Sequence, residues 1–281
     1  MNDTQTDAVL REWRESARYW EKHSATIRRM FAPLTTALVA EAGIVQGQSV
    51  LDVAGGPGEP SLTIAETVGP TGSVMCTDVV GEMVQAAERD AHRRAITNVT
   101  FRQCSADSLP FGKDSFDVVL SRLGAMFFPD PLAALLEMLR VTRTGGALAL
   151  AVWQKSEQNP FFHVVTEIMS RYVETPPADP DAPGAFRFAE PGKLASIITE
   201  AGAIDVRERF FNSQIQAPIS PDEFWDLRSA TSATLREKLT GVSEEQANRI
   251  GQEVKEAARR FFPNGHMSFP AQTIIVTARK D

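Results

Sequence analysis

Three glycines and two aspartates are the residues of this chain whose spacing is best suited to chemistry. Glycines 55, 56 and 58 follow a short apolar run that contains Asp52, and Asp78 ends a second such run about 20 residues later. Glycine lets the backbone approach a ligand more closely than any residue with a Cβ. Amides at the start of the following helix can donate to a polar ligand group, and an acid at the tip of the neighbouring strand can accept from two ribose hydroxyls. The pattern predicts a site for a nucleoside-bearing ligand; the alternative is an ordinary strand–helix turn of an unrelated α/β fold.

The residues that flank the glycines help to decide which nucleoside is bound. A dinucleotide fingerprint ends in Gly or Ala at the position where this chain has Ser61. Short-chain dehydrogenases also need Tyr-x-x-x-Lys, whereas Tyr19 and Tyr172 are followed four places later by His23 and Pro176. A Rossmann-type NAD(P) oxidoreductase is therefore the less favoured alternative.

The glycine cluster resembles motif I of the class I S-adenosylmethionine-dependent methyltransferases, which is an acid followed by G-x-G-x-G. Asp52 supplies the acid, and Gly56 and Gly58 supply the last two glycines. Ala54 replaces the first glycine, and this change could restrict how closely the methionine end of the cofactor approaches.

Three later segments resemble further motifs of this family, in the same order. Residues 105–111 resemble the segment that places an acid beside the adenine amino group and a backbone donor beside a ring nitrogen. Residues 116–121 resemble the fourth strand of the family, and residues 140–146 resemble the stretch before its fifth strand. The resemblance covers roughly residues 45–153, and the overall pattern is similar to that of the ubiquinone/menaquinone-biosynthesis-like group of small-molecule methyltransferases.

The resemblance implies S-adenosylmethionine as the cofactor. The residues that it assigns to cofactor binding are Asp52, Ala54, Gly55, Gly56, Gly58, Asp78, Val79, Met83, Ala106, Asp107, Ser121, Arg122 and Trp20. Methyl transfer can depend largely on proximity and alignment, and it needs a general base only where the acceptor carries a proton of high pKa. No motif identifies such a base; Tyr19, His23 and His266 are weak candidates, and the four histidines show no metal-ligand spacing.

The alternation of β-rich and helical segments predicts a Rossmann-like, doubly wound α/β fold. We expect a seven-stranded sheet, mostly parallel with an antiparallel last strand, and added helices that form a lid. The expected organisation is an N-terminal helical lid (1–44), a cofactor-binding core (45–153), a helical insertion followed by a helix (154–203), and the last two strands with a helical insertion at about 220–262 (204–281).

The added segments carry their own signals. Residues 5–32 have an amphipathic pattern that Pro33 is expected to interrupt before a second helix over 34–42. Four prolines within 176–183 predict a stiff exposed loop. The aromatic residues of these segments are interpreted as an apolar roof over the pocket or, alternatively, as a satellite core or dimer interface; they are Tyr19, Trp20, Phe161, Phe162, Phe261, Phe262 and Phe269.

The carboxyl-terminal half contains the remaining strands and two helix starts. The sixth and seventh strands are expected at 204–211 and 272–278. Ser220 and Ser243 are each followed three residues later by Glu or Gln, which predicts two capping boxes.

Composition and charge limit the range of partners. The chain has 281 residues and 43% hydrophobic content, enough for a full core. Its net charge of −7 argues against nucleic acid as a partner, since binding a phosphate backbone requires a basic surface. The longest apolar run, residues 147–153, is too short for a membrane span, and the amino terminus lacks a signal-peptide pattern. Cys76 and Cys104 are interpreted as thiols in a reducing compartment, so we expect a cytoplasmic protein.

Together these observations favour an enzyme that transfers a methyl group from S-adenosylmethionine to a small, apolar or aromatic organic acceptor by in-line displacement. The alternative is a non-catalytic protein that binds S-adenosylmethionine or S-adenosylhomocysteine. We expect a small-molecule partner and a monomer or homodimer. We expect the added helices, rather than the core motifs, to determine which acceptor is methylated.

Overall fold

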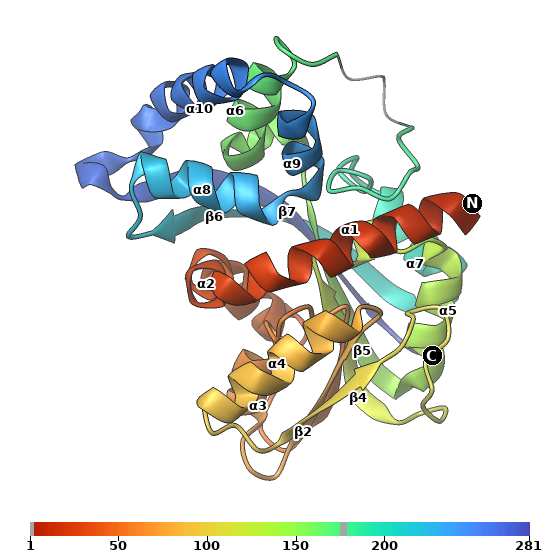
Figure 1. Ribbon diagram of the computed structural model, residues 1–281. Helices are drawn as coiled ribbons and strands as arrows, with labels where there is room; N and C mark the ends of the chain where they lie inside the picture. Colours follow the sequence, from red (N-terminus) through yellow and green to blue (C-terminus); the bar gives the residue numbers. More distant parts are fainter. Residues whose placement is uncertain (1–2, 175–178) are drawn as a thin grey trace.

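The computed structural model of the protein describes residues 3–174 and 179–281, and these form one seven-stranded sheet (Figure 1). Its order is β3-β2-β1-β4-β5-β7-β6. The neighbouring strands from β3 to β5 are parallel, and β7 is antiparallel to both β5 and β6. The bounds are β1 Ser49–Val53, β2 Ser73–Asp78, β3 Val99–Gln103, β4 Phe116–Arg122, β5 Thr142–Trp153, β6 Ile204–Ala217 and β7 Met267–Arg279. The predicted fold class is confirmed, including the antiparallel last strand.

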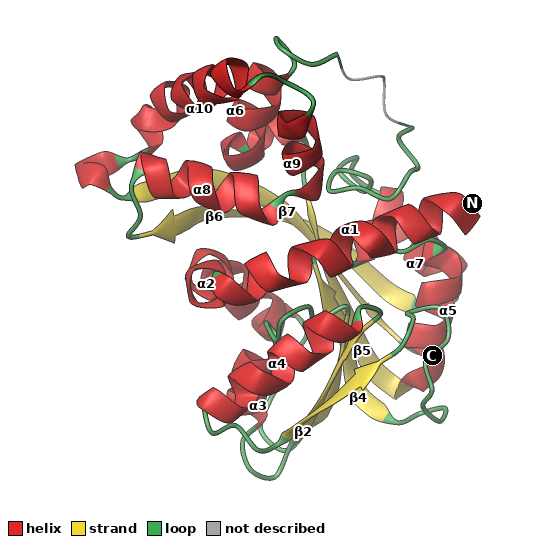
Figure 2. Cartoon of the chain, viewed as in Figure 1, coloured by secondary structure: helices red, strands yellow, loops and turns green. Residues whose placement is uncertain are grey.

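Helices cover both faces of the sheet (Figure 2). Val50 and Leu51 of β1 are both fully buried and belong to hydrophobic clusters on opposite faces. This burial on two sides explains why the parallel strands are continuous apolar runs in the sequence. One cluster is shared with α2 (Ser24–Glu41), α3 (Ser61–Val68) and α4 (Gly81–Arg93), and the other with α5 (Pro131–Val141) and α7 (Lys193–Glu200).

The last two strands are longer than predicted and extend beyond the rest of the sheet. Trp153, the last residue of β5, pairs with Thr273, so residues 267–272 of β7 pair with β6 alone. The extension was not predicted from the sequence for two reasons. Pro270 interrupts the apolar pattern of β7, and β6 continues into residues 212–216, which are mostly polar. Around the extension lie α6 (Pro160–Met169), which contacts β7, and α8 (Pro221–Thr231), α9 (Ala233–Thr240) and α10 (Glu244–Ala258), which pack against α6 or against one another.

The amino-terminal helix breaks at a different residue from the one predicted. α1 (Asp3–Lys22) ends before His23, and α2 continues through Pro33. The prediction of a break at Pro33 is wrong because Pro33 lies on the exposed side of α2, where water can bind the carbonyl that loses its helical partner. The opposite side buries Phe31 and Leu34 in the core, so packing keeps the helix together.

Several smaller predictions can be compared with the structure. Ser220 and Ser243 both form complete capping boxes, as predicted. Cys76 and Cys104 are free thiols. Part of the proline-rich loop predicted at 176–183 lies outside the described residues, and no helix of the described chain is long and apolar enough to cross a membrane.

Candidate functional site

The predicted site residues lie at the carboxyl edge of the parallel strands. β1 lies between β2 and β4, so the strand order reverses at β1, and ligands of open α/β sheets bind at such a reversal. Asp78 is the last residue of β2, and Arg122 is the last residue of β4. The turn after β1 is tied to β2 by a hydrogen bond from the Gly55 amide to the Thr77 carbonyl, 2.8 Å long.

The three glycines of the turn have different structural roles. A Cβ on Gly55 would lie 2.7 Å from Cys76 Sγ, and one on Gly58 would lie 3.3 Å from the backbone of Ala87 in α4. These two glycines are therefore required by packing inside the protein. A Cβ on Gly56 would have no atom within 4 Å, and Gly56 has a φ of +56°. Gly56 is thus the glycine of the turn that faces open space in which a ligand can lie.

Asp78 is held in place by the backbone at the edge of this space. Its Oδ2 accepts a hydrogen bond from the Gly56 amide at 3.0 Å, and its Oδ1 accepts one from the Val80 amide at 2.9 Å. Burial raises the pKa of Asp78 to about 6, although these backbone donors oppose the shift. Each carboxylate oxygen can accept a further hydrogen bond, so Asp78 can bind two hydroxyl groups of a ligand.

Asp52 is the other acid of the site, and it is completely buried. Its Oδ2 accepts from Ser61 Oγ at 2.5 Å, while its Oδ1 has no hydrogen-bond partner within the described residues. Burial raises the pKa of Asp52 to about 7, and the nearby Arg122 guanidinium only partly opposes this. Asp52 Oδ1 therefore remains available to a hydrogen-bond donor of a ligand.

Arg122 completes the polar set at the ends of β1 and β4. It donates to Thr35 Oγ1 of α2 at 2.6 Å and to the Glu59 carbonyl at 2.9 Å, which leaves its Nε and the neighbouring Ser121 Oγ buried without partners in the described chain. Acceptor Asp52 Oδ1 and donor Arg122 Nε would complement a ligand with one ammonium and one carboxylate group. The methionine end of S-adenosylmethionine has both groups, so the residues present fit this cofactor.

The residues expected around the adenosine are brought together in part. Trp20 of α1 packs against Val80 and Met83 at the start of α4, and Val79, the residue before Val80, is 37% exposed. Ala106 is half-buried, whereas Asp107 is exposed after β3 and makes no hydrogen bond or ion pair within the described part of the chain. An exposed Asp107 is free to accept from a ligand.

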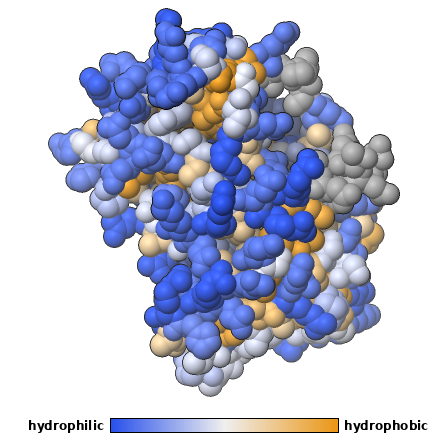
Figure 3. All heavy atoms as spheres, in the orientation of Figure 1, coloured by the Kyte–Doolittle hydropathy of each residue, from blue (hydrophilic) through white to orange (hydrophobic). Residues whose placement is uncertain are grey.

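α1 bridges the sheet and the added helices across this site (Figure 1). On the sheet side, Arg89 of α4 holds Glu21 through two hydrogen bonds of 2.8 Å. On the other side, Trp20 Nε1 donates to the Thr231 carbonyl of α8 at 3.2 Å. The molecular face crossed by α1 is mostly hydrophilic, and hydrophobic residues show mainly near the top and to the right of the centre (Figure 3). Ala17 and Trp20 of α1 pack with Val80 and Met83, so an apolar side of α1 faces the start of α4.

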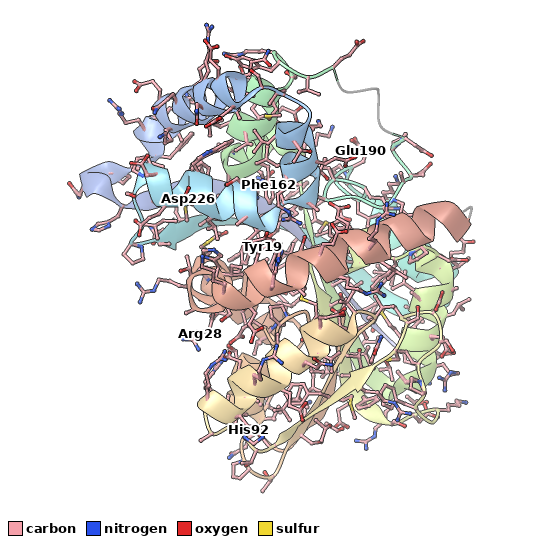
Figure 4. The ribbon with its side chains drawn as sticks, in the orientation of Figure 1. Tyr19, Arg28, His92, Phe162, Glu190 and Asp226 are labelled. Carbon is pink, nitrogen blue, oxygen red and sulfur yellow. The ribbon has the colours of Figure 1, made fainter. Side chains whose placement is uncertain are left out.

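Two of the three candidate bases lie together, and the third does not. Tyr19 and His23 line a cleft of ≈ 530 Å³ between α1 and α8, together with Asp226 (Figure 4). The Tyr19 hydroxyl already accepts from Arg18 at 2.7 Å, and burial lowers the pKa of His23. His266 is exposed at the far end of the β7 extension, about 20 Å along the strand from the sheet edge. His266 is thus remote from the cofactor residues.

Four of the seven residues of the predicted aromatic roof pack in the hydrophobic core that the added helices share with the sheet; they are Phe161, Phe261, Phe262 and Phe269. Phe161, Phe262 and Phe269 are buried and contact one another or Phe224, with the stacked Phe224–Phe269 ring centroids 5.0 Å apart. Phe162 differs, because its ring lies 5.0 Å from that of Trp153 at the end of β5.

Three residues near this edge of the sheet were not identified from the sequence as site residues; they are Phe31, Thr35 and Trp153. Trp153 contacts both Phe162 and Phe31 of α2, the Phe31–Trp153 ring centroids being 5.8 Å apart. Thr35 binds Arg122 as described above. Only Trp153 had a signal in the sequence, as a large aromatic residue at the end of a predicted strand.

Comparison with known proteins gives consistent matches. The model of the "ubiE/COQ5 methyltransferase family" matches residues 24–173, more than half of the chain. An uncharacterized Mycobacterium tuberculosis protein, Rv1405c, is 43% identical over 124 residues, which are 44% of this chain and 44% of that protein. The UbiE ubiquinone/menaquinone biosynthesis C-methyltransferase of Hahella chejuensis is 33% identical over 148 residues, 52% of this chain and 58% of that protein. The matches therefore span about half the length of these curated relatives.

A similar fold occurs in a solved methyltransferase. The phosphoethanolamine N-methyltransferase 2 of Haemonchus contortus, in complex with phosphomonomethylethanolamine and S-adenosylhomocysteine, aligns with a TM-score of 0.58 and 17% identity. The alignment covers 96% of this chain and 60% of that one. At this identity the likeness concerns the fold.

Proposed function

Because the chain belongs to the ubiE/COQ5 methyltransferase family, with S-adenosylmethionine as its cofactor, we propose that it transfers a methyl group to a small, apolar or aromatic organic acceptor. The observation that supports this best is the set of unpartnered polar atoms at the ends of β1 and β4, beside a glycine that faces open space. These atoms complement the charges of the cofactor's methionine end.

In this proposal the cofactor lies across the ends of β1, β2 and β4. Asp78 accepts hydrogen bonds from both ribose hydroxyls, and Gly56 allows close backbone approach. Asp52 Oδ1 binds the ammonium group, and Arg122 Nε binds the carboxylate. Trp20, Val79 and Met83 contact the adenosine from the side of α4, with Asp107 and the Ala106 backbone at the adenine edge.

When bound, S-adenosylmethionine would supply an electrophilic methyl carbon; a nucleophilic atom of the acceptor would donate an electron pair to it, and the electrons of the broken C–S bond would stay on sulfur. The protein aligns the acceptor in line with that bond, and alignment alone can supply much of the acceleration. Phe31, Trp153 and Phe162 offer the apolar wall expected of a pocket for a small aromatic molecule. α1 excludes water from the reacting atoms.

A proton lost by the acceptor can leave through the cleft beside α1. His23 has a lowered pKa and is therefore neutral at pH 7, so it can accept a proton from an acidic acceptor. Its place in the cleft with Asp226 supports this role, whereas the position of His266 gives no support for a second base.

The experiment that tests the proposal separates it from its two alternatives. Isothermal titration calorimetry with S-adenosylmethionine, S-adenosylhomocysteine and NAD comes first. A methyl-donor assay against phenols, quinols and amines follows, with His23→Gln as a variant. Binding of both adenosyl compounds together with methyl transfer supports the proposal. Binding without transfer to any acceptor supports the non-catalytic alternative, and binding of NAD alone would overturn both.

A further inference from the structure

A half-buried arginine in the added helices, Arg228, has a buried Nε and no ion-pair partner within the described residues. Within the described residues, the buried side-chain atoms without a hydrogen-bond partner are Asp52 Oδ1, Ser121 Oγ, Arg122 Nε, Gln154 Oε1 and Arg228 Nε. The first three belong to the proposed cofactor site, and Gln154 follows β5 at the same edge of the sheet. Arg228 is the exception, because it lies on α8 and outside that site. Native proteins leave few buried polar atoms unpaired, so this atom requires an explanation.

The guanidinium of Arg228 is surrounded by rings rather than by acids. Its Cζ lies 4.7 Å from the centroid of the Phe161 ring and 4.9 Å from that of Phe162. Burial lowers the pKa of Arg228 to about 10, and no acidic neighbour raises it. The side chain therefore remains positively charged at neutral pH in an apolar setting, where an unpaired charge is unfavourable.

The acidic residues of α8 do not pair with Arg228. Asp222 binds Lys255 at 2.8 Å, and Glu223 caps the helix by accepting from the Ser220 amide at 2.8 Å. Asp226 lines the cleft beside Tyr19. The helix positions that share a face with Arg228, three and four residues away in each direction, are Phe224, Trp225, Thr231 and Ser232, and none of them is acidic.

The location of Arg228 connects it to the reacting edge of the sheet. Phe162, whose ring faces the guanidinium, lies 5.0 Å from Trp153 at the end of β5. Figure 4 shows Phe162 among the added helices, above Tyr19 of α1. α8 also contacts α1 through Trp20, which packs beside the start of α4. Arg228 thus belongs to the wall that the added helices present toward the proposed acceptor pocket.

We propose, on the basis of the function proposed above, that the methyl acceptor is an organic anion whose carboxylate or phosphate group binds Arg228. The planar fork of an arginine suits a two-point hydrogen bond to either oxyanion. Phe162 and Trp153 contact the apolar body of the same molecule. The oxyanion supplies the counterion that the protein lacks, and it fixes which atom of the acceptor faces the methyl donor.

The test uses matched pairs of anionic and neutral probes. We would titrate the full chain, saturated with S-adenosylhomocysteine, with 4-hydroxybenzoate against methyl 4-hydroxybenzoate, and with phenyl phosphate against phenol. At least one anion should bind about tenfold more tightly than its neutral partner, as for a charge-assisted hydrogen bond. The stronger of the two anions identifies carboxylate or phosphate as the preferred group.

Variants of Arg228 decide whether the arginine causes this preference. Arg228→Gln should abolish it, and Arg228→Lys should retain part of it because the charge remains and the fork does not. The matched control is Arg209→Gln, which removes an arginine that lies 5.5 Å from the Phe211 ring but is paired with Glu41. This control should leave the preference unchanged.

Two results would overturn the inference, and neither depends on the methyl-transfer proposal. The first is equal affinity of both anions and their neutral partners for the wild-type protein, measured with and without S-adenosylhomocysteine. The second is an unchanged preference in Arg228→Gln, combined with a lower Tm of the unliganded variant, which would mean that Arg228 supports the fold through its rings. Failure of the cofactor to bind wild-type protein would instead overturn the proposed function.

Discussion

Substitution of Asp52 by asparagine should stabilise the unliganded protein at high pH. The pKa of Asp52 rises from the ordinary 3.8 to about 7 because the carboxylate is buried. An acid whose pKa is higher in the folded than in the unfolded state contributes stability below pH 4, and that contribution is lost as the pH rises to about 7. The whole difference is about 4 kcal/mol, of which about 3 kcal/mol falls between pH 5 and pH 8. Asparagine keeps a partner for Ser61 and does not ionise.

The assay is urea unfolding of wild type and Asp52→Asn at pH 5, 6, 7 and 8. The free energy of unfolding of the variant should exceed that of wild type by an amount that grows with pH. Asp117→Asn is the control, because Asp117 is partly exposed, accepts from the Ser49 amide and pairs with Arg143. It should show no gain at pH 8. A difference between Asp52→Asn and wild type that is the same at pH 5 and pH 8 would refute the reasoning.

The same variant should bind the cofactor less well. If the cofactor's ammonium group pairs with Asp52 Oδ1, binding holds the carboxylate in its ionised form. At pH 8 we expect Asp52→Asn to weaken S-adenosylmethionine binding by roughly tenfold or more. A variant that is more stable without ligand and weaker in binding would connect the unpaired oxygen with cofactor binding, and calorimetry measures the second part.

The remaining predictions concern the glycine turn, the ribose site and the lid. Asp78→Ala should weaken S-adenosylhomocysteine binding by about ten- to hundredfold, since two hydroxyls lose a charged acceptor; unchanged affinity in calorimetry would contradict the nucleoside placement. Gly56→Ala should cost about 1–2 kcal/mol at its positive φ, keep a cooperative melt and bind cofactor weakly, whereas Gly55→Ala should disrupt the fold through contact with Cys76. In hydrogen exchange the amides of α1 should become more protected when S-adenosylhomocysteine is added; amides that are already as protected as β4 in the free protein would identify α1 as scaffold.

The core of the fold could be predicted because its local signals agree with one another. Glycine clusters, strand ends and helix caps each require particular residue types at fixed spacings, so the positions of β1 to β5 along the chain follow from residues 45–153 alone. The capping boxes at Ser220 and Ser243 were found for the same reason.

The limits of the added helical segments were harder to predict, because they depend on tertiary packing. Pro33 does not end α2, since Phe31 and Leu34 are buried against the sheet. α2 is therefore part of the core, and within residues 1–44 the hypothesis of a lid now concerns α1 alone. Likewise, no local pattern distinguishes Phe162, which faces Trp153, from Phe161, which is buried in the core.

The site residues also differ in how far sequence could identify them. Asp52 and Asp78 could be identified as site residues because they lie near the ends of predicted strands. Arg228 could not, because an arginine on an amphipathic helix is ordinary until the structure shows which neighbours are missing. What distinguishes Arg228 is that no acidic residue lies beside it in the described chain. Only the three-dimensional structure shows this.

Several unfavourable features of the molecule meet at one edge of the sheet. Ala54 and Leu123 have positive φ values of 59° and 63°, which non-glycine residues adopt at an energetic cost, and they follow β1 and β4. The unpaired atoms of Asp52 and Arg122 lie at the ends of the same two strands. Strain and unpaired charge persist where the surrounding structure enforces them and a bound ligand relieves them. The packed clusters on both faces of the sheet supply that enforcement, and this coincidence makes the edge of β1 and β4 the place where binding should most increase the stability of the protein.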